Sequence, residues 1–376
     1  INTITLYHLI FVVKIKNNMR VCIFGSGLSS LTLAKALVNQ KIYVDLIDRK
    51  KVTNINYSRT LGISKSNVDF FNDHIVNIKK NIWKLRKIEI FTDNLKKEKL
   101  LNFENDNEQL FSIVKNHKIY EILEKSLSNK KYFKKIYCSD TISYLDNYDL
   151  VINTDYFNQI NIRFFNKKIS KKYNSFAYTT IIRHKNILND TAVQIFTKYG
   201  PLAFLPISNN QTSIVYSIHS LKNMDKIDIK ELIQKYNFKY KINKIEKVES
   251  FELKSFSLRS YSHANILAFG DLLHRVHPLA GQGFNMTIRD IKILLDIIKE
   301  KINLGLPLDS SVSDQFEKKL RHKNFIFSNS IDLIHEFFNF ERKLKSNILS
   351  KSVKALGKNP SVNKLFTKIA DRGVLF

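Results

Sequence analysis

The stretch Ile266-Leu-Ala-Phe-Gly-Asp-Leu-Leu-His-Arg-Val-His-Pro-Leu-Ala-Gly-Gln-Gly-Phe-Asn-Met-Thr-Ile-Arg-Asp290 decides the fold predicted for this chain. An apolar run at residues 266–269 predicts a strand, and a helical pattern of apolar residues that Asn285 opens predicts a helix. The loop between them carries Gly281 and Gly283, so its backbone N–H groups can approach a ligand closely. The positive end of the helix dipole favours an anionic or electron-rich group. The pattern therefore predicts a strand, a cofactor loop and a helix.

The same stretch resembles a flavin motif. Asp271, then residues 277–285, then Arg289-Asp290 is similar to the second flavin motif of the FAD-dependent aromatic hydroxylases of the p-hydroxybenzoate hydroxylase fold, and most similar to that of the ubiquinone-biosynthesis hydroxylases. The resemblance implies that the Asp holds the ribityl chain and that the loop lies along the pyrimidine side of the flavin ring. A glycine-rich turn capping an ordinary helix is the alternative. The residues that the resemblance assigns to FAD are Asp271, Pro278, Gly281, Gln282, Gly283, Phe284 and Asn285.

A second glycine motif stands near the start of the chain. A short apolar run at residues 20–24 is followed by Gly25-Ser-Gly27-Leu-Ser-Ser30 and a helical pattern. Gly25 suits a tight turn, Gly27 lets the backbone approach a pyrophosphate, and Ser30 is small enough for the helix to pack closely on the strand. Asp48 ends the next predicted strand, where an acid can accept hydrogen bonds from the adenosine ribose. Together with the motif around Asp271, this pattern favours FAD over NAD.

The order of these motifs predicts an α/β fold. It has a Rossmann-like FAD-binding domain, a second, mainly antiparallel β-sheet substrate domain, and C-terminal helices. Alternating patterns between residues 176 and 256 predict the antiparallel strands, with one helix near residues 228–236. Residues 1–18 precede Met19 and are interpreted as a leader outside the fold, with an interfacial anchor as the alternative. The predicted FAD-binding domain comprises residues 19–75, 105–160 and 257–330; the substrate domain comprises 76–104 and 161–256; and the C-terminal helices comprise 331–376.

Three positions depart from the family pattern or extend it. Arg59 precedes a predicted helix and is a candidate FAD contact, although an exposed surface Arg is the alternative. A helix is predicted over residues 111–123, and in it His117 stands where the family has an Arg that contacts FAD. A neutral imidazole donates fewer hydrogen bonds than guanidinium, so weaker FAD binding is expected. Tyr156 follows Asp155 where the family has Gly, so a strained backbone and altered NAD(P)H binding are expected there.

One segment resembles the family's substrate side. Residues 200–206, Gly-Pro-Leu-Ala-Phe-Leu-Pro, are similar to a segment of the ubiquinone hydroxylases that faces the substrate. The alternative is a sheet edge whose prolines block further pairing. His277 is a weak hypothesis for a catalytic base, and no catalytic residue is assigned. His274 and His277 lack further ligands nearby, so no metal site is predicted.

Composition limits the class of protein. The chain has 376 residues, 44% of them hydrophobic, and a formal net charge of +27 at pH 7. No nucleic-acid-binding pattern accompanies that charge, so a generally basic surface is favoured over a nucleic-acid partner. Two cysteines give no disulfide framework, which is typical of a reducing, cytoplasmic compartment. The basic amphipathic pattern beyond residue 330 predicts packing on the core or contact with an anionic membrane surface, peripheral at the inner face.

The resemblance implies a reaction. Reduced nicotinamide, NADH or NADPH, gives a hydride to FAD, O2 adds to the reduced flavin, and the hydroperoxide so formed hydroxylates an electron-rich ring. The expected function is therefore an FAD-dependent monooxygenase acting on a prenylated phenol in ubiquinone biosynthesis, alongside other proteins of that pathway as potential partners. Two alternatives stay open. One is a flavin-binding scaffold without NAD(P)H turnover, and the other is a flavin dehydrogenase or reductase on the same fold.

Overall fold

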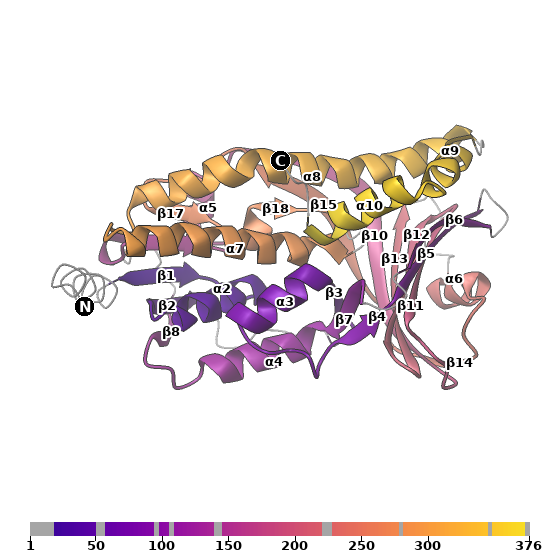
Figure 1. Cartoon of the computed structure of the whole chain (residues 1–376), viewed down its shortest axis with the longest axis horizontal. Helices are drawn as coiled ribbons and strands as arrows, with labels where there is room; N and C mark the ends of the chain where they lie inside the picture. Colours follow the sequence, from indigo (N-terminus) through magenta and orange to yellow (C-terminus); the bar gives the residue numbers. More distant parts are fainter. Residues whose placement is uncertain are drawn as a thin grey trace.

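The computed structural model describes residues 19–49, 57–93, 98–104, 109–138, 145–219, 228–277, 281–344 and 348–372, so the predicted leader at residues 1–18 lies outside the described residues. A parallel sheet flanked by helices lies at one end of the molecule, and a large antiparallel sheet lies at the other (Figure 1). The C-terminal helices run along the top of both (Figure 1). This arrangement confirms the predicted fold class.

The parallel sheet carries the nucleotide motif. Its strand order is β16-β17-β9-β1-β2-β8, and every neighbouring pair is parallel except β16 with β17. Parallel strands end at one common edge, so the residues that follow β1, β2, β9 and β17 meet there. The strands are β1 Arg20–Phe24, β2 Tyr43–Asp48, β8 Phe133–Tyr137, β9 Leu150–Asn153, β16 Ser262–His263 and β17 Ile266–Ala268.

Helices on both sides of this sheet bury its apolar side chains. The helix predicted after the flavin loop is α7, and it begins at Gln282 instead of Asn285. Ile288, Ile291 and Leu294 on α7 are fully buried in the same core as the strands, as their helical spacing predicts. The helices around this sheet are α2 Leu28–Asn39, α4 Asn116–Leu127, α5 Gln159–Phe164 and α7 Gln282–Asn303.

A small antiparallel sheet joins the two ends of the molecule. It consists of β3 Thr60–Ser64, β7 Phe111–Lys115 and β4 Trp83–Leu85, and α3 Lys65–His74 follows β3. The helix predicted from Phe111 is therefore wrong for its first five residues, which form β7. Ile113 and Val114 are both buried but in different clusters, since successive side chains of a strand point to opposite faces. The helix begins only at Asn116.

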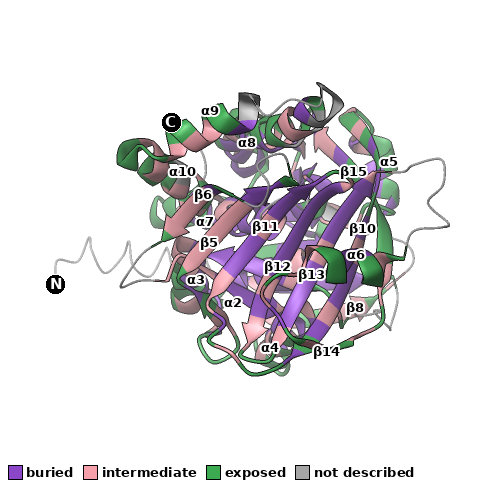
Figure 2. Ribbon diagram, turned by 90° about the vertical axis from the view of Figure 1, so that its right-hand side faces the viewer, coloured by how far each residue is buried: buried purple, intermediate pink, exposed green. Residues whose placement is uncertain are grey.

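The large sheet is the predicted antiparallel unit. Its strand order is β18-β15-β10-β13-β12-β11-β5-β6, with β14 paired to β10, and only β11 with β5 is parallel. Helix α6, Ile229–Tyr236, covers its outer face (Figure 2), where Leu232 and Ile233 pack on Phe204 and Tyr216. The strands are β5 Lys87–Thr92, β6 Lys99–Glu104, β10 Lys168–His184, β11 Thr191–Thr197, β12 Gly200–Ser208, β13 Gln211–His219, β14 Ile242–Ile245, β15 Glu249–Leu258 and β18 His274–Arg275.

Two strands pair with a strand that was predicted to belong to the other domain. β18 lies within residues predicted for the FAD-binding domain, yet it pairs with β15 of the large sheet. β4 lies within residues predicted for the substrate domain, yet it pairs with β7 of the small sheet. The two units therefore share strands, because a buried backbone needs hydrogen-bond partners wherever they lie in the chain.

The C-terminal helices are α8 Ser310–Leu344, α9 Ile348–Gly357 and α10 Pro360–Arg372. Asn324 of α8 donates to the Asp290 carboxylate of α7 at 3.3 Å, and Asn363 of α10 donates to the Asn102 carbonyl of β6 at 2.9 Å. Asp371 of α10 accepts from the Ser66 N–H of α3 at 2.9 Å, so this part of the segment beyond residue 330 packs on the flavin side, as one of its two interpretations predicts. Across the part of the chain that the structure describes, we find no helix with the length and apolar character that crossing a bilayer requires.

Candidate functional site

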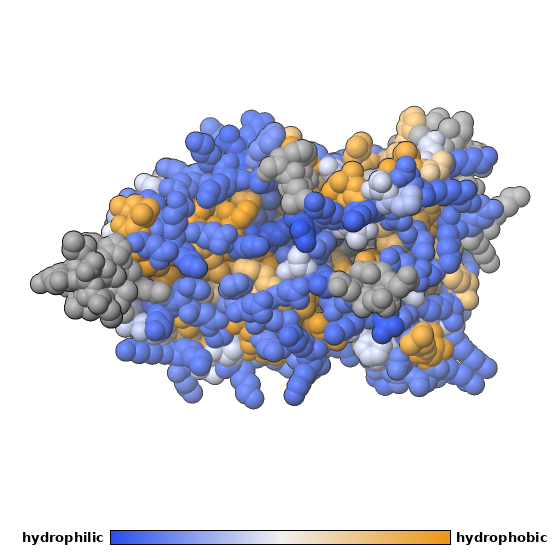
Figure 3. Space-filling model, viewed as in Figure 1, coloured by the Kyte–Doolittle hydropathy of each residue, from blue (hydrophilic) through white to orange (hydrophobic). Residues whose placement is uncertain are grey.

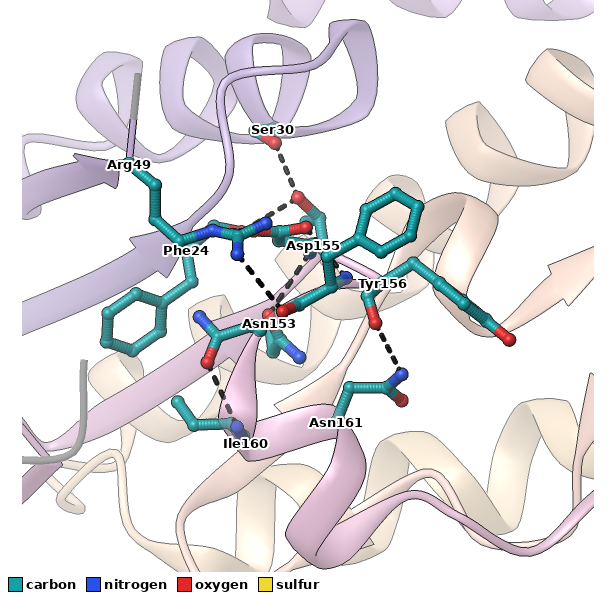
Figure 4. Close-up of polar contacts among 11 residues, drawn as sticks. Phe24, Ser30, Arg49, Asn153, Asp155, Tyr156, Ile160 and Asn161 are labelled. Carbon is teal, nitrogen blue, oxygen red and sulfur yellow. Dashed lines mark hydrogen bonds and ion pairs between the residues drawn. The ribbon is translucent and has the colours of Figure 1, made fainter. Parts of the chain in front are cut away.

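The turn between β1 and α2 has the geometry that the first glycine motif predicts. Gly25 has φ +108°, and its N–H donates to the Ile47 carbonyl at 2.9 Å. A Cβ atom on Gly25 would lie 2.5 Å from Oγ1 of Thr154 in the segment after β9. The Ser30 hydroxyl contacts the same Thr154 oxygen at 2.6 Å, so α2 is held close to the ends of both strands (Figure 4).

The N-terminus of α2 is open to a ligand. Its N-cap residue is Gly27, and the helix has neither a side-chain cap nor an acidic residue in its first turn. Among the described residues, a Cβ atom added to Gly27 would find no heavy atom within 4 Å. The uncapped N–H groups and the positive end of the helix dipole at this point fit a pyrophosphate group.

The second motif reaches this helix end. Gly270 has φ +65°, and a Cβ atom on it would lie 2.7 Å from Cβ of Ser29 in the first turn of α2. Only a residue without a side chain allows this approach. Asp271, which is exposed, follows directly in a short 3-10 helix. Two motifs that are far apart in sequence therefore lie against each other at the open helix end.

Replacing Gly270 with alanine tests this contact. We expect a loss of about 2 kcal/mol in the free energy of unfolding, from a strained left-handed backbone and the clash with Ser29. Adding Ser29→Gly to this variant should restore the part of the free energy of unfolding that the clash removes. Urea denaturation measures the free energy of unfolding of each variant. A double-mutant cycle with strictly additive effects would show that the two residues do not touch.

The flavin loop reaches the small sheet at its other end. Gly281 is the N-cap of α7 in the left-handed region, with φ +62°. A Cβ atom on it would lie 3.4 Å from both N and Cα of Gly62 in β3. Gln282 is 5% exposed, and its Oε1 atom has no hydrogen-bond partner among the described residues. A buried acceptor without a partner indicates a missing ligand. Pro278 lies outside the described residues.

Asn285 holds this loop in place. Its Oδ1 accepts from the Ser64 backbone N–H and from Nδ2 of Asn67, both at 2.9 Å. Its Nδ2 donates to the carbonyls of Gly62 at 2.9 Å and Gly281 at 3.1 Å. The Asn285 side chain is fully buried, and all its hydrogen-bonding groups are engaged. The Asn285 side chain therefore positions the loop, and its predicted contact with the cofactor stays a prediction for the backbone.

Phe284 also points away from the ligand side. Its ring lies in the main core, 6.3 Å from the ring of Phe71. By contrast, a Cβ atom added to Gly283 would have a Val276 methyl group, 4.0 Å away, as its nearest neighbour among the described residues. Within this part of the motif, the backbone around Gly283 remains for contact with a cofactor.

An ion pair crosses the edge of the parallel sheet. Asp48, at the end of β2, is 8% exposed. The next residue, Arg49, places Nε and Nη2 at 2.8 and 2.7 Å from one carboxylate oxygen of Asp155, beyond the end of β9 (Figure 4). Arg49 also donates to the Phe157 carbonyl at 3.1 Å. The motif analysis did not foresee this pair, whose partners are far apart in sequence.

Tyr156 carries no backbone strain, so the strain predicted at this position is wrong. It is not among the non-glycine residues with positive φ. Asparagine and aspartate side chains shape the turn instead: Asn153 accepts from the Asp155 N–H at 3.1 Å, and Asp155 accepts from the Phe157 N–H at 2.9 Å. The Tyr156 carbonyl accepts from Asn161 at 2.7 Å (Figure 4). The turn therefore forms without a left-handed residue.

Arg59 and His117 lie beside each other at the start of β3 and α4. The Arg59 carbonyl accepts from the Asn116 N–H at 3.0 Å, and Arg59 itself is exposed. His117 is 8% exposed, and its Nδ1 atom has no hydrogen-bond partner among the residues described. Burial lowers the pKa of His117, and the nearby Lys118 and Lys115 lower it further. The imidazole is therefore neutral at pH 7.

Restoring a charge at residue 117 should strengthen FAD binding. The variant His117→Arg is expected to bind FAD about fivefold to tenfold more tightly, because a charge-assisted hydrogen bond replaces a neutral one. Fluorescence titration of the apoprotein with FAD measures the affinity. His117→Gln is the neutral control, and equal affinities for the two variants would exclude residue 117 from cofactor binding.

The segment 200–206 lies in the interior of the large sheet. β12 has neighbours on both sides, β11 and β13, so the sheet-edge alternative is wrong. Its side chains alternate between faces: Leu202 and Phe204 pack under α6, whereas Leu205 pairs with Ser213. The Ser213 hydroxyl contacts the Thr60 hydroxyl of β3 at 2.8 Å. The alternate residues face the other way, and Leu205 packs against Leu85 and Ile113 of the small sheet.

Tyr173 links three parts of the molecule. Its hydroxyl donates to the Asp332 carboxylate of α8, and its ring lies edge-on to the His277 ring at 5.0 Å. Burial, with the nearby Asp332, raises the pKa of Tyr173, so it stays a hydrogen-bond donor. His277 is 1% exposed and packs in this junction. No local pattern in the sequence predicts the role of Tyr173, because its partners come from distant segments.

Sequence comparison matches part of the chain. Residues 157–303 match a family model described as FAD binding domain. The 3-demethoxyubiquinol 3-hydroxylase of Escherichia coli is 29% identical over 165 residues, which are 42% of this chain and 42% of that protein. A mitochondrial ubiquinone biosynthesis monooxygenase of Schizosaccharomyces pombe is 23% identical over 229 residues, 49% of this chain and 48% of that protein. The chain thus spans less than half the length of the curated relatives it matches.

Structural comparison covers nearly the whole chain. A p-nitrophenol 4-monooxygenase from Pseudomonas putida superposes with a TM-score of 0.73 and 11% identity, over 95% of this chain and 100% of that one. A probable FAD-dependent monooxygenase from Pseudomonas aeruginosa gives 0.67 and 13%, over 89% and 99%. The match to an FAD binding domain, the similarity to ubiquinone hydroxylases and the shared fold confirm the predicted resemblance of this chain to FAD-dependent aromatic hydroxylases.

Proposed function

We propose that this protein is an FAD monooxygenase that hydroxylates an aromatic ring of a prenylated phenol, with NAD(P)H and O2 as co-substrates. The contact of Gly270 with Ser29 carries the proposal, because it joins both glycine motifs into one site at an open helix end. The names of the relatives from Escherichia coli and Schizosaccharomyces pombe support the substrate class.

The chain offers a group for each part of FAD. The open N-terminus of α2 at Gly27 would hold the pyrophosphate, Asp48 would accept from the adenosine ribose, and Asp271 would hold the ribityl chain. The N-terminus of α7 at Gly281 has no acidic residue in its first turn and would stabilise negative charge beside the ring. When bound, FAD supplies hydride acceptance and oxygen activation.

The protein must also keep water away from the reacting ring. An apolar cluster joins the first turn of α7 to the large sheet and α8: Met286, Phe196 and Phe327 are all buried in it. The rings of Phe196 and Phe338 stack with centroids 3.6 Å apart. Val276, which precedes the flavin loop, packs on the same cluster. This apolar wall would exclude water and strengthen the electrostatic effect of the loop N–H groups.

One observation favours a second function, a flavin-binding scaffold without NAD(P)H turnover. The resemblance associates Asp155 with both FAD and the nicotinamide cofactor, yet Arg49 engages its carboxylate with two nitrogen atoms. A flavin dehydrogenase or reductase is the remaining alternative. The three functions differ in what reduces the flavin and in whether oxygen is consumed.

Absorbance and oxygen uptake separate these functions. A purified sample should be yellow with flavin peaks, and NADPH or NADH should bleach them in stopped-flow measurements, faster with a prenylated phenol present. Oxygen uptake matched by hydroxylated product would support the monooxygenase. Bound flavin that neither nicotinamide reduces would point to the scaffold, and turnover without oxygen uptake to a dehydrogenase.

A further inference from the structure

Helices α9 and α10 present a basic, partly apolar face to solvent. We call residues 348–372, which form these two helices, the strap. The exposed positions of α10 recur at helical spacing, so Lys364, Leu365 and Lys368 lie on one face. Leu356 of α9 and Leu365 of α10 are each 54% exposed. Hydrophobic and hydrophilic side chains alternate over this part of the surface (Figure 3, upper right). The exposed residues used below are Lys351, Leu356, Lys358, Lys364, Leu365 and Lys368.

The charged residues of the strap are mostly basic. The strap contains six basic residues and a single carboxylate, Asp371. That carboxylate is turned inward, since it accepts from the Ser66 N–H at 2.9 Å at the start of α3. Lys354 pairs with Glu98 at 2.6 Å beside the strap. Glu98 is exposed and also lies near Lys351 and Lys358, so the charge of α9 is partly balanced. The positive face of the strap is therefore carried mainly by Lys364 and Lys368 of α10, on either side of Leu365.

The strap crosses the junction between the two sheets. At one end, α9 packs on the edge strand β6, where a Cβ atom on Gly357 would lie 2.1 Å from Leu101. At the other end, the Asp371 carbonyl accepts from the Ser64 hydroxyl at 2.9 Å. Ser64 also donates its N–H to Asn285, which holds the flavin loop. Between them, Ile369 packs on the apolar cluster around Phe196 and Met286. The inner face of the strap thus packs on the elements around the flavin loop, and its outer face is exposed to solvent.

We propose that the strap docks this protein on an anionic lipid surface. The lysines complement lipid phosphates, and the exposed leucines suit insertion between headgroups, which a nucleic-acid partner does not require. The inference rests on the proposed function, because a prenylated phenol resides in a bilayer. It assigns one face of the molecule, above the domain junction, as the side that meets the lipid.

Binding to vesicles tests the assignment without requiring turnover. The probe is vesicles of phosphatidylcholine, alone or mixed equally with phosphatidylglycerol, sedimented with the full-length flavin-loaded protein. Binding should occur only with the mixed vesicles and should weaken as salt rises. The double variant Lys364→Glu, Lys368→Glu should bind at least about 25-fold more weakly, since each lysine near such a surface contributes about fivefold. Leu356→Ser with Leu365→Ser should also weaken binding, with an unchanged salt dependence.

A matched control changes the same charge elsewhere. Lys130→Glu with Lys131→Glu alters two exposed lysines next to β8, at the far edge of the parallel sheet. The control should bind vesicles like the unaltered protein. An equal loss of vesicle affinity in both double variants would show that the net charge of the protein, and not the strap, causes binding. Unchanged vesicle affinity in the strap variant would also overturn the assignment. Flavin absorbance reports that the variants are folded, and hydroxylation of a soluble phenol reports separately on the proposed function.

Discussion

Gly27→Asp is expected to abolish tight FAD binding and leave the fold intact. The site tolerates a side chain, because Gly27 has φ −71° and an added Cβ atom meets no heavy atom within 4 Å. Aspartate is a favoured N-cap residue, so the apoprotein should gain up to about 0.5 kcal/mol. The new carboxylate would occupy the pyrophosphate position, and two like charges about 4 Å apart near a protein surface repel by about 4 kcal/mol. FAD affinity should fall at least about a hundredfold, measured by fluorescence titration of the apoprotein.

Gly27→Asn separates charge from shape. Asparagine caps the helix about as well and fills the same space without a charge, so it should lower FAD affinity by only about tenfold. High salt screens the charge repulsion, so it should reduce the difference in FAD affinity between Gly27→Asp and Gly27→Asn. If Gly27→Asp bound FAD as tightly as the unaltered protein, the pyrophosphate would lie elsewhere and the proposed site would be wrong.

Asn285→Leu is expected to cause the largest loss of stability. It would remove four side-chain hydrogen bonds from a fully buried site: those to the Ser64 N–H, the Asn67 amide and the carbonyls of Gly62 and Gly281. A net hydrogen bond contributes about 1 kcal/mol, and a buried group left unsatisfied costs more, so a loss of roughly 3–5 kcal/mol is expected in the free energy of unfolding. FAD affinity should fall as well, because the N-terminus of α7 would lose its attachment to β3. Urea denaturation and FAD titration give the two readouts.

A control lies two residues away on the same helix. Thr287 is also fully buried, and its hydroxyl has no hydrogen-bond partner among the described residues. Thr287→Val keeps the shape of the side chain and should therefore cost less than about 1 kcal/mol. A similar cost for both substitutions would mean that the Asn285 hydrogen bonds do not stabilise the loop.

In the variant Asn285→Asp, the free energy of unfolding is expected to depend on pH. One oxygen of the new carboxyl would face the carbonyls of Gly62 and Gly281, where Asn285 now donates. This repulsion raises the pKa of the new carboxyl in the folded state above its unfolded value. The loss in free energy of unfolding should be complete above the raised pKa. It should become smaller as the pH falls toward about 4, where the protonated carboxyl can donate a hydrogen bond again. Denaturation curves of this variant at several pH values measure the effect.

Local patterns in the sequence were enough to predict the fold class and both glycine motifs. Gly25, Gly27 and Gly281 stand between an apolar run and a helical pattern, and such short-range spacing reflects backbone geometry that a few neighbouring residues determine. The open end of α2 follows from the same local sequence, because it contains neither a capping side chain nor an acid. The segment at Phe111 shows the limit, since pairing with β3 and β4 made its first residues a strand.

The contacts that assemble the site depended on the tertiary structure. Asn285 is buried against Gly62, Asp155 pairs with Arg49, and Asp371 joins the strap to α3. Each contact joins segments far apart in the chain, and no local spacing encodes which partner will be near. The sequence by itself therefore determined most of the elements, such as the two glycine turns and the helices that follow them, and indicated where a cofactor would bind. Only the packing of distant segments decided which side chains hold the cofactor loop, because that packing sets which buried polar groups must satisfy one another.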